Sequence, residues 1–223
     1  MGWRRLMGAQ SGASTAEVFS NVYRHKRWGR NGGQRFFSGP GSHDPDIVEP
    51  YVAAVCNFLD GFAKPPQVTD LGCGDFNVGS RIRSRCGAYT ACDIVPELIR
   101  HNTQRFTELN VDFRCVNIID DALPPGEVAF LRQVLQHLSN AQIARVVPKL
   151  AGFRHLVLTE HLPDAEEFTP NADHEAGSGI RVARGSGVVL TAPPFNFAPR
   201  AQQELCRVRK YGGWVVTTVY ENG

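Results

Sequence analysis

The chain alternates short apolar runs with amphipathic stretches from residue 67 onward, and this pattern predicts its architecture. Short apolar runs between turn signals are typical of strands buried on both faces. Such runs predict strands at Gln67–Leu71, Tyr89–Cys92, Asp112–Val116, Val128–Leu131 and Leu156–Thr159. Apolar residues at helical spacing between them predict helices at Gly79–Arg85, Pro96–Leu109 and Ser139–Leu150. Strands that alternate with helices form a parallel sheet with right-handed crossovers, so the predicted fold class is α/β.

The N-terminal part of the chain breaks this pattern. It is rich in glycine, serine and arginine, a composition typical of irregular structure, with one short helix predicted at Thr15–Tyr23. Asp44, as a cap, followed by Pro45 predicts the start of a longer helix whose apolar side packs on the core. We therefore expect an arm or lid at 1–46 and a single domain at 47–223.

The C-terminal end also departs from the alternation. The pattern predicts a strand at Gly187–Leu190, a helix near Arg200–Lys210 and a strand at Trp214–Tyr220. The two strands suggest an antiparallel ending to the sheet.

Composition narrows the possible partners and the compartment. The 223 residues include 24 Lys and Arg against 22 Asp and Glu, a formal net charge of +2, which argues against a general polyanion binder. The six cysteines contain no C-x-x-C pair, which is typical of reduced thiols in the cytoplasm. No apolar stretch is long enough to cross a membrane, and no apolar run follows Arg4 and Arg5 as a secretory signal requires. We expect a cytoplasmic protein without membrane or nucleic-acid partners, and homodimerisation is a common default.

The stretch from Asp70 to Asn77 carries the strongest chemical signal. A predicted strand enters a loop with Gly72 and Gly74, and such glycines allow a tight turn and close approach of a ligand to the backbone. The carboxylate of Asp70 would repel a pyrophosphate but suits a cationic head such as an ammonium group. Asp93 ends the next strand about 20 positions later, where a ribose-binding acid is expected.

These residues resemble the class I S-adenosylmethionine-dependent methyltransferases over 47–223. The resemblance implies a Rossmann-like, mostly parallel seven-stranded sheet with an antiparallel last strand, and S-adenosylmethionine as cofactor. It assigns cofactor binding to Asp70, Gly72, Gly74, Asn77, Asp93, Ile94, Asn117, Ile118, Arg132 and Gln133, and we add Ser38 and Gly39 of the arm. Phe76 stands where the family motif has its third glycine. The alternative is a Rossmann-like domain that binds another nucleotide.

Methyl transfer to a hydroxyl is aided by a general base, and histidine is the usual one near pH 7. His137 follows the fourth predicted strand, and His161, beside Glu160, follows the fifth. Both strand ends face the edge where parallel sheets bind ligands. These three residues are the catalytic candidates, although a packing role for His137 is an equally good interpretation.

A long polar insertion precedes the last strands, and we expect it to cover the acceptor pocket. Asn171, Asp173 and Arg181 are its candidate substrate-binding residues. An acidic set could hold a divalent ion such as Mg²⁺, although a solvated loop is the favoured interpretation; it comprises Glu160, His161, Asp173, His174 and Glu175. The later Pro193-Pro194-Phe195 follows Ala192, which lacks the acceptor oxygen that amine methylation requires, so this segment is interpreted as an apolar wall.

The arm interleaves aromatic residues with cations, including Tyr23 and Trp28. This pattern suits RNA, a sugar, or closure over the cofactor with backbone N–H groups of 38–42 at its carboxylate. We favour a lid with Tyr23 and Trp28 against the substrate. The arm is similar to that of small bacterial methyltransferases of glycan or natural-product hydroxyls, among them enzymes of mycobacterial methylmannose polysaccharide assembly.

The favoured function is therefore methyl transfer from S-adenosylmethionine to a small-molecule hydroxyl, with a saccharide as the first choice. The alternatives are an RNA or protein methyltransferase that uses the basic arm, and a cofactor-binding module without catalysis.

Overall fold

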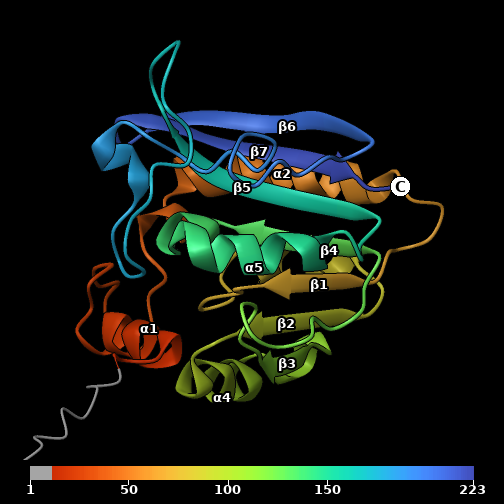
Figure 1. Ribbon diagram of the computed structural model, residues 1–223. Coiled ribbons are helices and arrows are strands. Elements are labelled where there is room, and N and C mark those ends of the chain that lie inside the picture. Colours follow the sequence, from red (N-terminus) through yellow and green to blue (C-terminus); the bar gives the residue numbers. More distant parts are fainter. Residues whose placement is uncertain (1–11) are drawn as a thin grey trace, which may run out of the picture.

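A computed structural model describes residues 12–223 and contains a seven-stranded sheet of order β3-β2-β1-β4-β5-β7-β6 (Figure 1). Its strands are β1 Val68–Leu71, β2 Tyr89–Asp93, β3 Asp112–Cys115, β4 Val128–Arg132, β5 His155–Pro163, β6 Ala201–Lys210 and β7 Gly213–Glu221. The strands β1 to β5 pair in parallel, and β7 is antiparallel to both of its neighbours. The predicted α/β architecture and its antiparallel strand are confirmed.

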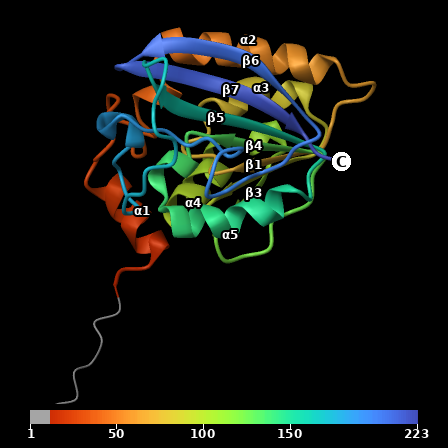
Figure 2. The ribbon, with the colours of Figure 1, turned by 45° about the horizontal axis from the view of Figure 1, so that its top comes forward.

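Helices cover both faces of the sheet, with α2 and α3 on one face and α5 on the other (Figure 2). The α-helices are α1 Thr15–Arg24, α2 Pro45–Asp60, α3 Gly79–Ile82, α4 Pro96–Arg105 and α5 Asn140–Leu150. Short 3₁₀ turns are η1 Pro40–Ser42, η2 Arg83–Arg85, η3 Thr107–Leu109, η4 Leu135–His137 and η5 Arg181–Arg184. A capping box begins α5, because the Ser139 hydroxyl accepts the Gln142 N–H while the Gln142 side chain accepts the Ser139 N–H.

The parallel register brings the carboxyl ends of the central strands to one edge of the sheet. Asp70 of β1 pairs with Ala91 of β2 and with Phe130 of β4, so Asp93 and Arg132 end their strands beside the loop that follows β1. The α1 helix lies at this same edge (Figure 1).

The predicted helix near Arg200–Lys210 is wrong, because this segment is strand β6 at the edge of the sheet. Its residue types favour a helix, but pairing with β7 through the tight turn at Tyr211 and Gly212 outweighs that preference. The predicted strand at Gly187–Leu190 is also wrong. This segment is irregular, because β7 already occupies the edge of β5 and the Asn171 side chain binds its backbone.

The strand β5 is longer than predicted, since it pairs with β7 along its full length from His155 to Pro163. Glu160 and His161 therefore lie inside a strand rather than after one, and their side chains point to opposite faces.

The arm shares the core of the sheet. Phe19, Val22, Tyr23 and Phe36 are buried in the same apolar cluster as residues of β4 and α5. Within residues 12–223 no helix is long and apolar enough to cross a membrane. The expectation about a secretory signal concerns residues 1–11, which lie outside the described part of the chain; the division at residue 46 and the cytoplasmic location stay predictions.

Candidate active site

A cavity of about 430 Å³ lies at the carboxyl ends of the strands, beneath the arm, and its volume is typical of small-molecule sites. Most of the predicted site residues line it: Tyr23, Trp28, Ser38, Gly39, Asp70, Gly72, Gly74, Asp93, Ile94, Asn117, Ile118, Arg132, Gln133, His137 and His161. The predicted residues outside this lining are Asn77, Glu160, Asn171, Asp173 and Arg181.

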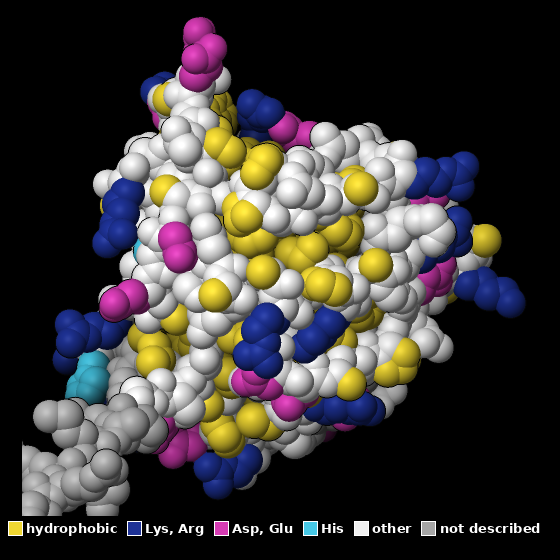
Figure 3. Space-filling model, viewed as in Figure 1, with side chains coloured by type: hydrophobic (Ala, Val, Ile, Leu, Met, Phe, Trp, Pro, Cys, Tyr) yellow, Lys and Arg dark blue, Asp and Glu magenta, His cyan; other side chains and the backbone are white. Residues whose placement is uncertain are grey.

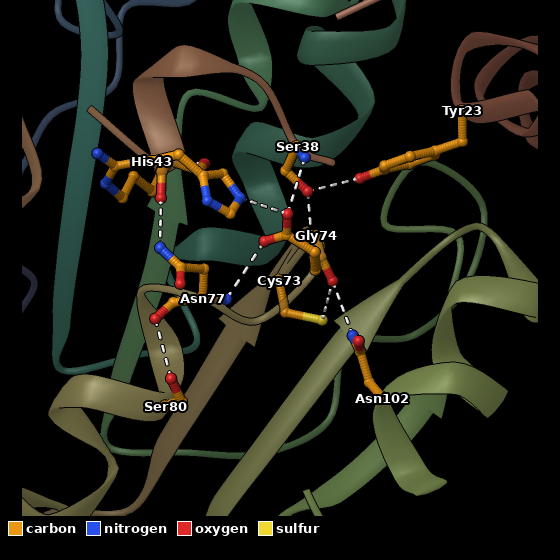
Figure 4. Close-up of polar contacts among 11 residues, drawn as sticks. Tyr23, Ser38, His43, Cys73, Gly74, Asn77, Ser80 and Asn102 are labelled. Carbon is orange, nitrogen blue, oxygen red and sulfur yellow. Dashed lines mark hydrogen bonds and ion pairs between the residues drawn. The ribbon is translucent and has the colours of Figure 1, made fainter. Parts of the chain in front are cut away.

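The loop after β1 presents bare backbone to the cavity at two glycines. Gly72 and Gly74 have φ of +85° and +57°, in the region that favours glycine. A Cβ atom would lie 2.5 Å from the Val134 side chain at Gly72, and 2.5 Å from Ser38 Oγ at Gly74. The Asn102 amide donates to the Gly74 carbonyl at 2.8 Å and holds the loop in place (Figure 4).

Phe76, which replaces the third glycine of the motif, is fully buried and adopts φ of +60°. Its ring packs edge-on against Tyr89, Phe106 and Phe113, with ring centres 5.0 to 5.5 Å away. A core aromatic residue therefore stands at the position of the third glycine, and the turn at Gly72 and Gly74 stays intact.

Two buried carboxyls flank the glycine turn. Asp93 accepts the Gly74 N–H on Oδ2 at 3.1 Å and the Val95 N–H on Oδ1 at 3.0 Å, and burial raises its pKa to about 6. Asp70 accepts the Tyr89 hydroxyl at 3.0 Å, and burial raises its pKa to about 7. Because burial disfavours their charged forms, both carboxyls are suited to a ligand that offers hydroxyl donors or a positive charge.

At the β3 end, Asn117 lines the cavity but already uses both ends of its side chain. Its amide nitrogen donates to Asp120 at 2.6 Å, and its oxygen accepts the Ile119 N–H at 3.0 Å. Ile94 and Ile118 also line the cavity and give it apolar surface. This end of the cavity thus offers apolar walls and backbone groups more than a free side-chain amide.

A polar network centred on Asp75 fastens the arm to the glycine loop, and Figure 4 shows Ser38 and His43 of the arm within it. The Ser38 N–H donates to Asp75 Oδ2 at 2.9 Å, and the Asp75 N–H donates to Ser38 Oγ at 2.8 Å. His43 Nε2 lies 2.6 Å from the same carboxylate, and the Tyr23 hydroxyl lies 2.9 Å from Ser38 Oγ. The Asn77 amide donates to the Ser42 carbonyl at 2.7 Å, so this side chain also holds the arm.

Sequence reasoning missed Asp75 and His43 as anchors of the arm. The position of Asp75 inside the glycine motif could have marked it as a site residue. Its partners could not be predicted, because they lie more than 30 residues away in the chain.

The end of β4 places a guanidinium and an amide in the cavity. Arg132 donates to the Gly41 carbonyl at 2.5 Å and to Gln133 Oε1 at 3.3 Å, and its guanidinium carbon lies 4.8 Å from the centre of the Tyr51 ring. Gln133 adopts φ of +55°, which turns the chain at the end of the strand. Both residues contact the arm as well as the cavity.

Two neutral histidines line the cavity with one lone-pair nitrogen each. His137 Nδ1 lies 3.0 Å from the Gly179 carbonyl, so Nδ1 carries the proton, and Nε2 accepts from the Gln136 amide at 3.3 Å. Burial lowers the pKa of His137 to about 4 and lowers that of His161 as well. His161 Nε2 donates to the Lys210 carbonyl at 3.0 Å, which leaves its Nδ1 as acceptor.

Glu160 is buried and does not belong to the cavity lining. Its Oε1 accepts the Leu135 N–H at 3.2 Å, Oε2 is buried without a partner, and burial raises its pKa to about 8. Through this hydrogen bond Glu160 holds η4, which carries His137, and its predicted catalytic role stays a prediction.

The insertion reaches the cavity, but through other residues than predicted. Asn171 binds the carbonyls of Val189 and Pro193, and Asp173 accepts the Asn140 N–H at 2.7 Å. Arg181 donates to the carbonyls of Leu135, Leu138 and Ala172 and to the Asn140 side chain, so it fastens the insertion to η4 and α5. Ser178 and Ile180 are the insertion residues that line the cavity.

The proposed divalent-ion set does not assemble. Among residues 12–223, no group of three or more His, Cys, Asp or Glu side chains could hold a metal ion. Asp173 and Glu160 instead accept hydrogen bonds from the backbone of other elements, and Mg²⁺ is not part of the site we describe.

In the described part of the arm, the aromatic rings pack on the protein itself. Tyr23 and Phe36 are buried, and the Trp28 ring packs against Tyr23 and His137 with ring centres 5.1 and 5.0 Å away. On the face in Figure 3, lysine and arginine side chains lie in small groups beside acidic ones rather than in one basic patch. These features do not favour RNA as the acceptor.

Comparison by sequence finds no family model and no curated protein that matches the chain. Comparison of structures finds the N-methyltransferase NodS from Bradyrhizobium japonicum in complex with S-adenosylhomocysteine, with a TM-score of 0.65 and 14% identity, covering 91% of this chain and 98% of NodS. Magnesium protoporphyrin IX methyltransferase from Synechocystis with bound S-adenosylmethionine has a TM-score of 0.60 and 14% identity, covering 96% and 100% of the two chains.

Human N-acetylserotonin methyltransferase in complex with S-adenosylmethionine has a TM-score of 0.59 and 18% identity, covering 95% of this chain. The chain spans 61% of the length of that human protein. The narrower resemblance to methylmannose enzymes stays a prediction. At these identities the likeness concerns the fold, and the chain has the Rossmann-like fold of the S-adenosylmethionine-dependent methyltransferases.

Proposed function

We propose that the chain is a methyltransferase that moves a methyl group from S-adenosylmethionine to a hydroxyl of a small acceptor held beneath the arm. The observation that carries this proposal is a single cavity that joins the glycine turn and Asp93 to a set of neutral histidine and aromatic side chains. A transferase of this kind needs both ligands in one enclosed space, with the acceptor aligned on the methyl group and water excluded.

The residues at the glycine end fit the cofactor chemically. Each oxygen of Asp93 accepts one backbone N–H and keeps further lone-pair capacity for the two ribose hydroxyls. Asp70 at the strand end suits the ammonium group, and a bound cation would favour its ionised form. Ile94 and Ile118 offer apolar surface for the adenine ring. When bound, the cofactor supplies an electrophilic methyl group on a positively charged sulfur.

The protein itself contributes position, enclosure and a proton acceptor. The arm covers the cavity and is held by Ser38 and His43 on Asp75. We assign the proton acceptor to His137 Nε2, because the Gly179 carbonyl fixes the tautomer that leaves this nitrogen unprotonated; the Gln136 amide lies 3.3 Å from Nε2 and has to give way to the acceptor hydroxyl. Its lowered pKa keeps His137 neutral at pH 7. The ring is therefore in the form that accepts a proton, although it is a weak base.

A saccharide hydroxyl is the acceptor that we place first. Trp28 is a half-buried aromatic ring in the cavity, and Gln133 and His137 are neutral hydrogen-bonding side chains in the same lining. An aromatic face with neutral polar neighbours suits a ring that bears several hydroxyls.

Calorimetry with S-adenosylmethionine and S-adenosylhomocysteine tests the cofactor half of this proposal. Asp93→Asn should weaken binding by about tenfold or more, because the amide offers one acceptor oxygen and turns a donor toward a backbone N–H. Asp112→Asn, at an exposed acid of the neighbouring strand β3, is the matched control and should bind as the wild type does. Absence of binding heat with both compounds would refute the proposed function.

Isotope-labelled cofactor incubated with monosaccharides, glycosides and other hydroxyl compounds tests the transfer half. Labelled product is expected from hydroxyl acceptors. Labelled product from amines alone would overturn the hydroxyl assignment while leaving the cofactor assignment in place.

A further inference from the structure

Arg132 is a cation in the cavity with only neutral partners. Its Nη2 donates to the Gly41 carbonyl at 2.5 Å, and its Nη1 lies 3.3 Å from both Ser42 Oγ and Gln133 Oε1. Within the described part of the chain, no carboxylate lies close enough to form an ion pair with it. Its guanidinium is therefore hydrogen-bonded on one side but not neutralised.

The Nε–H of Arg132 is buried and has no hydrogen-bond partner. Two other arginines that bind carbonyl groups differ in this respect. Arg83 and Arg181 each use Nε, Nη1 and Nη2 as donors to oxygen atoms of the chain. Since a buried donor left unpaired costs about 1–3 kcal/mol, an unpaired Nε in a ligand cavity points to a partner that comes with the ligand.

The distribution of charge in the cavity indicates which ligand brings that partner. The acidic lining residues, Asp70, Asp75 and Asp93, all belong to β1, the glycine loop and β2. The lining residues from α2, β5 and the β6–β7 turn are uncharged at neutral pH; they are Tyr51, His161 and Tyr211. Arg132 stacks on Tyr51 of α2, and its positive charge also acts on Asp70 at the end of β1.

We propose that Arg132 forms a carboxylate subsite for the acceptor, so that the cavity takes a hydroxy acid such as a uronate rather than a neutral sugar. A carboxylate can accept charge-assisted hydrogen bonds from a guanidinium group, and the two parallel bonds that arginine can donate make this one of its strongest pairings. This inference rests on the proposed function and narrows its acceptor class.

The matched probes are D-glucuronate and D-glucuronamide, which have the same ring and hydroxyls and differ in the negative charge. Their affinities are measured by calorimetry on protein saturated with S-adenosylhomocysteine. The acid should bind about tenfold more tightly or better, equivalent to about 1.4 kcal/mol, and this preference should vanish in Arg132→Gln. Arg132→Lys keeps the charge without the fork and should retain part of the preference.

The control variant is Arg24→Gln, which removes a cation from the exposed side of α1 and should keep the full preference. The ¹⁵N signal of Arg132 Nε, identified by its loss in Arg132→Lys, gives a direct readout. Glucuronate should shift this signal and glucuronamide should not.

Equal affinity for acid and amide, or no detectable binding of either, would overturn the carboxylate subsite. It would also be overturned if S-adenosylhomocysteine shifted the Nε signal while 5′-methylthioadenosine, which lacks the aminoacyl carboxylate, did not; the guanidinium would then serve the cofactor. Failure of the proposed function is distinguishable, because it appears as absent binding of S-adenosylhomocysteine, and the acid–amide comparison can still be made on the protein alone.

Discussion

Glu160→Gln is the most informative single substitution, because it replaces a buried carboxyl by its neutral counterpart of similar shape. Glu160 is 3% exposed, accepts the Leu135 N–H at Oε1 and has no partner at Oε2. Glutamine can keep the bond to Leu135, and its amide nitrogen meets the same unpartnered surroundings as Oε2. The substitution therefore removes the ability of this side chain to ionise while preserving most of its contacts.

The expected effect on stability depends on pH with a definite sign. Burial raises the pKa of Glu160 from 4.5 to about 8, so the folded state holds this proton more tightly than the unfolded state does. As pH rises from about 4.5 to about 8, the unfolded state ionises first and the wild type loses stability. Each tenfold difference in proton affinity is worth about 1.4 kcal/mol, so the loss reaches about 4–5 kcal/mol above pH 8. Glutamine removes this loss.

Urea unfolding at pH 5, 7 and 9 measures the effect. The free energy of unfolding of Glu160→Gln, relative to the wild type, should rise by about 4 kcal/mol between pH 5 and pH 9. Asp70 and Asp93 also have raised pKa values and act in the same direction, but they are common to both proteins and cancel. Glu166→Gln, at an exposed position after β5, is the control and should show no such trend. A difference that stays constant with pH within about 1 kcal/mol would refute the argument that Glu160 is held neutral.

Two further substitutions test the arm and the base. Gly74→Ala puts a methyl group 2.5 Å from Ser38 Oγ at a φ of +57°, so the arm should be displaced: affinity for S-adenosylhomocysteine should fall by about tenfold or more, and trypsin should cleave the arm faster. Unchanged cleavage would argue against the closed arm. His137→Ala should lower methyl transfer by about a hundredfold with cofactor affinity unchanged, and any titration of activity between pH 6 and pH 7 should persist in the variant, because the pKa of His137 is about 4 while those of Asp93 and Asp70 are about 6 and about 7. Full activity of the variant would exclude His137 as the base.

The glycine turn and its two acids were predictable because their signals are local. A strand, two glycines and a helix follow one another within the stretch from Val68 to Ile82, and the register of parallel strands then places Asp93 beside the turn. Strand pattern, turn residues and spacing all agree there.

The remaining features depend on partners far away in the chain. The segment Arg200–Lys210 has residue types that favour a helix, and only its pairing with β7 makes it a strand. The same pairing extends β5 through Glu160 and His161, which moved both residues out of the predicted loop. Arg181 and Asn171 resembled substrate ligands because they are polar and lie in a long loop, yet both bind backbone carbonyls. A buried polar residue that holds a loop and one that holds a ligand look alike in sequence.

The contact between Ser38 and the glycine loop bears on the order in which molecules enter and leave. Ser38 Oγ lies where a side chain at Gly74 would be, and the same serine is bound to Asp75 through two hydrogen bonds. Access to Gly74 from this side requires the arm to lift, which breaks both bonds and returns Tyr23 and Phe36 to water. A catalytic cycle in this chain would then include a mechanical opening and reclosure, and the departure of the spent nucleoside would be paced by them.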